Sequence, residues 1–364
     1  MGLAADWASA DCERRGAAQR FIPHLIEQGW LPALCWHQVE ELLQHQDDEL
    51  VDARLRYLRS WPLTAWIKAS DPDAGPGSVL DVLKAEVAVA YAQPHADALQ
   101  VRELVRTNLF AFGRATEAIP DLFQNWRLLR TALVDRQESA RKTAAISRWR
   151  PEKIESTRIT DWMNKPLRDL GEAIRKLEHL QNNLANEIAA RGDKRIVEPT
   201  AMAEAFFSEI IRSGQAISAE HALPPAIQIL VNAGLEPDDI DLSATFTETL
   251  DRLIFYKRLR IVAEANGLPF PDLKRIVTRD RLPVSIVEES MRLHAHDQPE
   301  RKGSDLNDVH LLCLAPYAHV TYVDKRTLES VRRARSKDFV FAKLIGQVSK
   351  ASNYRNISTE LTAL

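Results

Sequence analysis

Three aspartates stand in the otherwise apolar stretch SDLNDVHLLCLAPYAHVTYVDKRT at residues 304–327, namely Asp305, Asp308 and Asp324. Asp305 and Asp308 are three apart, so on a helix they share one face with roughly 5–6 Å between their β-carbons. Two carboxylates about 6 Å apart repel by about 3 kcal/mol at an effective dielectric of 20. A half-buried cluster of this kind needs protons or a cation, and oxygen ligands suit Mg²⁺ or Mn²⁺.

Each of these aspartates also has a purely structural interpretation. An acidic residue in the first turn of a helix stabilises the helix dipole, which explains Asp305 equally well. Asp308 precedes VHLLCLA and is expected at the rim of a buried face. Asp324 follows VTYV, at the carboxyl end of a strand where open α/β sheets bind ligands, but a turn residue that ends a strand is also often Asp. Both interpretations stay open.

The elements that would position these residues lie at the two ends of the chain. WLPALCW at 30–36 and PLTAWIKA at 62–69 predict strands, and the segment between them, 37–60, has helical spacing. Near the carboxyl end, Ser304 can cap a helix through DLNDVHLLCLA, AHVTYV predicts a strand, and Thr327 can cap a final helix at 328–337. The pattern predicts α/β structure at both ends.

The middle of the chain is predicted to be helical. The turn-rich SDPDAGPGS at 70–78 ends the first α/β part, and helical spacing then continues to about residue 295. The simplest assembly is one discontinuous α/β domain, made from residues 1–75 and 296–364 and interrupted by an all-α insertion at 76–295. The apolar stripe of the helix at 167–188 could pair with a second copy or a partner protein. RWRPEK at 148–153 and FYKRLR at 255–260 interleave aromatic and basic residues, a combination that can bind RNA.

Composition sets the class of protein. The 364 residues carry a net charge of −3, so attraction to nucleic acid has to come from local basic patches. No apolar run approaches the roughly 20 residues that cross a bilayer. The amino terminus lacks the pattern of a secretory signal, and the three cysteines form no CxxC pair. The expected location is therefore the cytoplasm.

The order of the quoted motifs resembles the PIN-like nuclease family. NDVHLLCLA followed by a break, a strand and VDKRT is similar to the carboxy half of that family, and LPALCWHQVEELLQH is similar to its earlier strand and helix. The resemblance covers roughly residues 1–70 and 297–364 and implies a parallel sheet with flanking helices. It assigns metal-binding and catalytic roles to Glu40, Asp308 and Asp324, with Asp305 as an additional metal ligand. Glu41 competes with Glu40 for the glutamate position.

The resemblance implies a divalent-metal-dependent ribonuclease, for example a toxin or defence nuclease. Lys325 and Arg326 adjoin Asp324 and are expected to contact substrate phosphates, with Arg332 and Arg333 as further local candidates. PIN-like domains begin with a strand that ends in the first catalytic Asp, and MGLAADWASAD contains no such strand. Either the native start lies upstream of Met1, or the domain is degenerate. In the second case the alternative function is a non-catalytic protein that binds partners through its helical domain.

Overall fold

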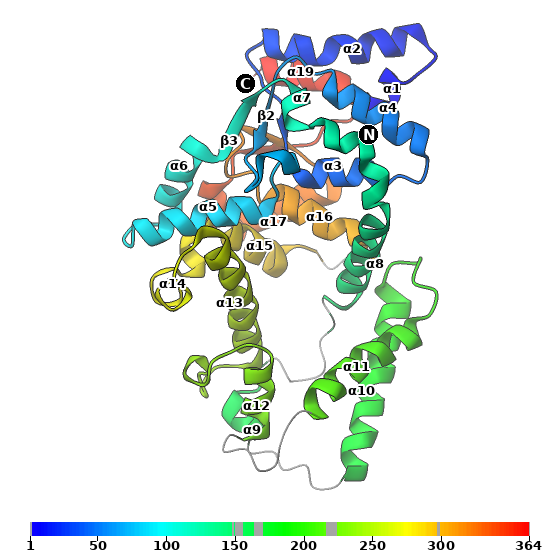
Figure 1. Cartoon of the computed structure of the whole chain (residues 1–364). Helices are drawn as coiled ribbons and strands as arrows, with labels where there is room; N and C mark the ends of the chain where they lie inside the picture. Colours follow the sequence, from blue (N-terminus) through cyan, green and yellow to red (C-terminus); the bar gives the residue numbers. More distant parts are fainter. Residues whose placement is uncertain are drawn as a thin grey trace. The chain divides into compact units, whose positions relative to one another are not determined.

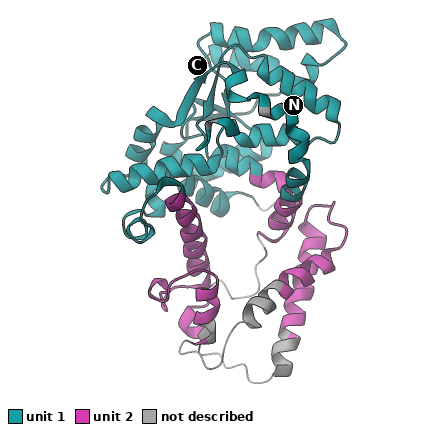
Figure 2. Cartoon of the chain, in the orientation of Figure 1, with its two compact units in different colours: residues 1–137, 265–296, 307–364 teal, residues 138–264, 297–306 magenta. Residues whose placement is uncertain are grey.

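The computed structural model describes residues 2–147, 149, 156–163, 170–215, 224–296 and 299–363. It is a mixed α/β structure in which helices predominate and two small sheets contain parallel strands (Figure 1). The chain divides into two compact units (Figure 2): unit 1 is residues 1–137, 265–296 and 307–364, and unit 2 is residues 138–264 and 297–306. The first division lies at residue 137, whereas the sequence pattern placed it at 75.

The first sheet joins β1 (Ala33–Leu34), β2 (Thr64–Ile67) and β3 (Phe110–Gly113) in that order. β1 and β2 are parallel and are connected through α3 (Trp36–Leu43) and α4 (Asp48–Arg59), so the predicted strand–helix–strand unit is present in shorter form. β2 pairs with β3 antiparallel, with Thr64 opposite Gly113 and Ile67 opposite Phe110.

The strand β3 corrects the helical prediction for ALQVRELVRTNLFAF. Helix α6 (Ala98–Leu109) ends where FAFG begins, and all four residues of FAFG pair with β2. Aromatic residues favour strands when a neighbouring strand is available, and that neighbour is β2, more than forty residues earlier. This pairing explains why the first part of unit 1 extends past residue 75.

The second sheet is the parallel pair β4 (Val320–Tyr322) and β5 (Gln347–Ser349), connected through α17 (Lys325–Lys337) and α18 (Phe339–Leu344). The sequence predicted β4 but not β5. Helix α17 begins three residues before the predicted start, because Asp324 caps it: the Asp324 Oδ1 accepts from the Thr327 N–H at 2.7 Å. Thr327 therefore lies inside the helix rather than at its cap. Within the described chain the parallel strands occur in two sheets instead of the single sheet that was predicted.

Helices make up the remainder of unit 1. The chain opens with two of them, α1 (Gly2–Trp7) and α2 (Cys12–Glu27), which Asp11 caps. The other helical elements of this unit are α5 (Val79–Ala92), α7 (Ala115–Ala118), the 3₁₀ segment η2 (Asp121–Leu129), the start of α8 (Arg130–Ile146), α14 (Phe270–Ile276), α15 (Pro283–His294), most of α16 (Gly303–Leu312) and α19 (Tyr354–Thr362). None of the helices among the described residues has the length and apolar character needed to span a bilayer.

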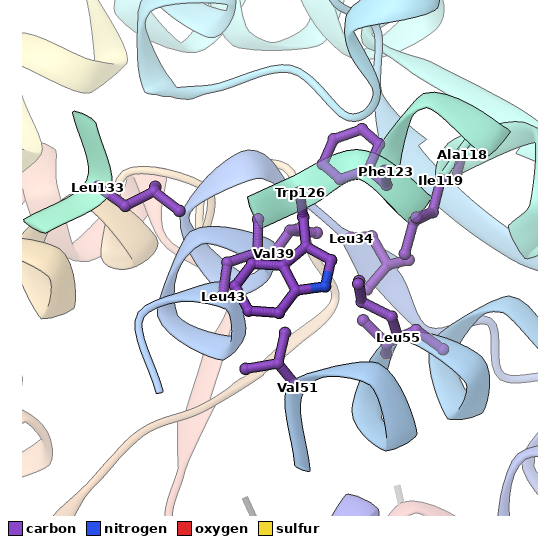
Figure 3. Close-up of a cluster of buried hydrophobic side chains, with 11 residues drawn as sticks. Leu34, Val39, Leu43, Val51, Leu55, Ala118, Ile119, Phe123, Trp126 and Leu133 are labelled. Atoms are coloured by element: carbon purple, nitrogen blue, oxygen red, sulfur yellow. The ribbon is translucent and has the colours of Figure 1, made fainter. Parts of the chain in front are cut away.

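A buried cluster beside the first sheet holds α3, α4 and η2 together. Figure 3 shows the indole of Trp126 among side chains that include Val39, Leu43 and Val51. Trp126 is fully buried, and its Nε1 donates to the Asp52 Oδ1 at 2.8 Å, so the one polar atom of the indole is satisfied. The same cluster includes Leu34 of β1, which fixes helix α3 against the sheet.

The regular secondary structure described in unit 2 is helical, apart from an isolated β-bridge between Arg158 and Thr245. It contains α9 (Ile159–Met163), α10 (Leu170–Arg191), α11 (Pro199–Gln215), α12 (Pro225–Asn232) and α13 (Phe246–Asn266), whose last two residues belong to unit 1. α10 and α11 form a hairpin around Leu184, Ile188 and Phe207. The helix predicted at 167–188 corresponds to α10, although residues 167–169 lie outside the described residues. Most of RWRPEK also lies outside them, and FYKRLR lies within α13.

Candidate anion-binding site

Helix α3 buries one of the two competing glutamates and exposes the other. Glu40 is only 2% exposed, whereas Glu41 faces solvent. The Glu40 Oε1 lies 3.0 Å from the Arg136 Nε, and the Oε2 lies 3.7 Å from the His37 Nδ1. A buried carboxylate needs a charged partner, and the ion pair with Arg136 allows Glu40 to be buried. The glutamate beside the buried His37 is therefore Glu40 and not Glu41.

The buried His37 lies against a second imidazole, that of His310. Its Nε2 accepts a hydrogen bond from the Val79 backbone N–H, with 3.4 Å between the two nitrogens, and its Nδ1 faces Glu40. The ring lies 4.9 Å from the ring of His310, centroid to centroid, at 35°. His310 is half-buried.

Asp305 and Asp308 both lie on α16 and are half-buried. The Asp305 Oδ2 accepts from the Lys302 N–H at 2.9 Å, a contact at the amino end of the helix. This contact matches the structural interpretation of Asp305, in which its charge stabilises the start of the helix.

Asp324 caps α17 and lies next to Arg326, whose Nε is 3.5 Å from its Oδ2. Partial burial raises the pKa of this carboxyl group, but the hydrogen bonds from Thr327 and the charge of Arg326 outweigh burial and hold the pKa below its usual value. Arg326 therefore forms an ion pair with Asp324.

Throughout the described ranges, no three His, Cys, Asp or Glu side chains are arranged so that they could hold a metal ion. Glu40, Asp308 and Asp324 are not gathered into such a group. Each of Glu40 and Asp324 instead has a local cationic partner, Arg136 and Arg326 respectively.

An open pocket of about 440 Å³ lies in unit 1 at the carboxyl end of β5. One face of α17 supplies four of its residues, spaced as neighbours along a helix surface. The end of β5 supplies three more, and α19 supplies one. The lining residues are Lys325, Leu328, Glu329, Arg332, Val348, Ser349, Lys350 and Glu360. This is the edge of a parallel strand pair where α/β proteins bind ligands.

Three cations and two carboxylates line the pocket, and the carboxylates are engaged. Glu329 lies 3.9 Å from the Lys325 Nζ, an exposed pair. The carboxylate of Glu360 accepts a hydrogen bond from the Tyr322 hydroxyl. Burial, together with the charge of Glu360, raises the pKa of Tyr322 to about 12. In the part of the chain that the structure describes, no carboxylate lies within ion-pair distance of Arg332 or Lys350. These two cations give the pocket its capacity for an anion.

The pocket uses only part of the basic sequence on α17. Lys325 and Arg332 line it, but Arg326 does not. Arg333 contacts His296. Arg335 donates to the carbonyl oxygen of Gly346.

Sequence reasoning missed Lys350 and Glu360. The signal for Lys350 was weak, because it follows a strand of only three residues. Comparison of the chain with models of protein families, with curated proteins and with solved structures gives no match. What the chain does is therefore inferred from its own residues.

Proposed function

We propose that this pocket binds phosphate groups of a nucleic acid, with single-stranded RNA as the first ligand to test. The proposal rests on two cations that line one open pocket and have no carboxylate partner. Arg332 comes from α17, and Lys350 follows β5. An arginine guanidinium presents a planar fork of N–H donors that matches phosphate oxygens, and a lysine supplies a compact charge beside it.

Local charge is what allows a chain of net charge −3 to bind a polyanion. The pocket is open, so an extended strand can reach it. Phosphate contacts of this kind position the ligand without reading its sequence. We therefore expect salt-dependent binding with little sequence preference.

Binding is tested by fluorescence anisotropy with labelled RNA of mixed sequence over a series of salt concentrations. Arg332→Ala and Lys350→Ala should each weaken binding and lower the slope of log affinity against log salt by about 0.7, the value for one phosphate contact on a single strand. Arg275→Ala is the matched control, because it removes one exposed cation from α14 in the same unit. Equal weakening by the control would mean that net charge, and not the pocket, attracts RNA.

Cleavage of the bound RNA is a second proposal, and it is favoured by the position of Asp324 between the end of β4 and the pocket residue Lys325. RNA would be incubated with the full chain with and without Mg²⁺ or Mn²⁺, beside Asp324→Asn and Asp308→Asn. Asparagine caps helices as well as aspartate does, so Asp324→Asn keeps the start of α17. Asp97→Asn at the cap of α6 is the control.

The outcome separates a ribonuclease from a protein that binds RNA without cleaving it. Cleavage that is lost in Asp324→Asn and retained in Asp97→Asn supports a ribonuclease. Binding without cleavage in either metal supports a non-catalytic protein that acts by holding its ligand.

A further inference from the structure

Strand β3 forms one edge of the first sheet, in which β2 is its only described neighbour (Figure 1). Edge strands present a row of backbone N–H and C=O groups on their free side, and such a row can pair with a strand of another chain. Which groups of β3 lie on that side follows from the hydrogen bonds of β2.

Residues of β2 turn their backbone groups alternately toward β1 and β3. The Ala65 N–H donates to the carbonyl oxygen of Pro32 at 2.9 Å, on the side of β1. Lys68, directly after β2, donates from its backbone N–H to the carbonyl oxygen of Leu109, directly before β3, at 3.0 Å. The backbone groups at 64, 66 and 68 therefore point toward β3.

The register then assigns the backbone groups of β3. The residues opposite 66 and 64 are Ala111 and Gly113, so these two bond to β2. Phe110 and Phe112 alternate with them and point their N–H and C=O groups to the free side. Within the described chain, no hydrogen bond reaches the backbone N–H or C=O of either phenylalanine.

The two outward positions also carry aromatic side chains. Successive side chains of a strand alternate between its faces, so Phe110 and Phe112 share one face, with 6.4 Å between their ring centroids. Phe112 is 64% exposed. Natural edge strands are commonly protected by charged residues or proline, and FAFG contains neither. β3 is therefore a free and apolar edge.

The pattern of β3 is complementary to itself, because its outward groups lie symmetrically on either side of Ala111. When two copies of β3 run antiparallel with Ala111 on the axis, Phe110 of each lies opposite Phe112 of the other, and each pair exchanges two hydrogen bonds. All the outward groups of FAFG are then satisfied. Aromatic side chains directly opposite each other stabilise a strand pair, and the uncharged segment brings no like charges together.

We propose that a second copy of this chain adds to the free edge of β3 as an antiparallel strand, so that two three-stranded sheets join across a two-fold axis at Ala111. A two-fold interface uses the same patch on both copies, as this register does. An unrelated extended peptide would gain the backbone hydrogen bonds but not the matched phenylalanine pairs. The contact is small, so the dimer forms in a concentration-dependent manner.

The test is sedimentation equilibrium of the full chain over about a hundredfold range of concentration, through which the chain should pass from monomer to dimer. Phe112→Pro removes one outward N–H, at a position where an edge strand accepts proline, and should leave only monomer. Phe339→Ala is the matched control, because it removes a phenylalanine that is 70% exposed on α18 of the same unit, and it should leave the dimer intact. Circular dichroism checks that each variant keeps its helix content.

A cross-link tests the register, and it also decides the question if Phe112→Pro does not fold. Ala111 meets its own copy at a non-hydrogen-bonded pair, where the Cα atoms are about 4.5 Å apart, a separation that a disulfide spans. Ala111→Cys should give a covalent dimer under mild oxidation, whereas Thr107→Cys, exposed on α6, should not. Both variants also carry Cys12→Ser, which removes the exposed native thiol.

The outcomes separate this strand pairing from other contacts. A covalent dimer of Ala111→Cys, together with a monomeric Phe112→Pro, supports the proposal. A chain that stays monomeric at every concentration overturns it, even if an unrelated peptide then proves to bind the edge. So does a folded Phe112→Pro variant that still forms the dimer, or a covalent dimer that forms equally from Thr107→Cys.

Discussion

Glu86 is a carboxyl group sealed in the core of unit 1, and its ionisation sets a testable dependence of stability on pH. It is 0% exposed. Its Oε1 accepts from the Tyr317 hydroxyl at 2.7 Å, and both of its oxygens lie 3.1 Å from the Val284 N. Burial raises the pKa of Glu86 to about 8, although the hydrogen bonds from Tyr317 and Val284 act in the opposite direction.

The sign follows from the comparison of folded and unfolded chains. The pKa of Glu86 is about 8 when folded and near 4.5 when exposed, so the folded chain holds this proton more tightly. Its contribution to stability is fully present below pH 4.5 and is lost as the pH rises through 8. The two pKa values differ by about 3.5, and each pKa unit corresponds to about 1.36 kcal/mol. Protonation of Glu86 therefore adds at most about 5 kcal/mol to the free energy of unfolding.

The perturbation is Glu86→Gln, which keeps the shape of the side chain and removes its ionisation. At pH 5 the variant should be less stable than the native chain by about 1 kcal/mol. The amide NH₂ of glutamine replaces one carboxyl oxygen and cannot accept a hydrogen bond as that oxygen can. As the pH rises to 9 the native chain loses stability and the variant does not. The variant should then be the more stable by several kcal/mol, within the limit above.

The assay is urea unfolding at a series of pH values, combined with hydrogen exchange of the α15 amides as a reading of unit 1 alone. The quantity compared is the difference between variant and native chain, so that other titrating groups cancel. Tyr317→Phe removes a hydrogen bond that lowers the pKa of Glu86, and it should move the transition to higher pH. A difference between Glu86→Gln and the native chain that stays constant from pH 5 to 9 would refute the reasoning.

Three further predictions concern the core, the strand pair and the thiols. Trp126→Ala should lower the free energy of unfolding by about 3–5 kcal/mol, measured by urea titration, because it empties the cluster of Figure 3. Gly346→Ala should lower the free energy of unfolding by about 1–3 kcal/mol, since the added methyl group meets the carbonyl oxygen of Ala318 beside β5. Thermal melts should show a lower melting temperature, and an unchanged one would contradict that close approach. Cys12 is exposed, whereas burial raises the pKa of Cys35 to about 11, so iodoacetamide at pH 8 should modify Cys12 first; mass spectrometry of the digested chain would show the opposite order if this is wrong.

Local signals in the sequence were sufficient for several elements of the site. The strand in AHVTYV, the helix after it and the position of Asp324 between them follow from residue types within a few positions of each other. The same is true of β2 within PLTAWIKA. Lys325 and Arg332, two of the candidate phosphate contacts that the sequence offered near Asp324, both line the pocket, whereas the candidate Arg326 does not.

Pairing between distant segments could not be predicted in this way. β5 is three residues long and has no periodicity of its own, and it is a strand only because β4 lies beside it. FAFG would continue a helix if β2 did not pair with it. The pairing of β2 with β3 extends the first part of unit 1 beyond residue 75. The two units are divided at 137 and 264, with residues 297–306 also in unit 2, whereas the turn-rich segments had suggested limits of 75 and 295.

The sequence by itself determined that Asp324 ends a strand and that a helix follows it, although that helix starts three residues before the predicted position, with Asp324 as its cap. Only the tertiary structure decided that Glu40 is buried against Arg136 while Glu41 faces solvent, and that Lys350 meets Arg332 at one pocket. A cap or a helical stripe depends on free energies shared among neighbours in the chain. Which distant residues meet depends on how the whole chain buries its apolar surface, and no short stretch encodes that.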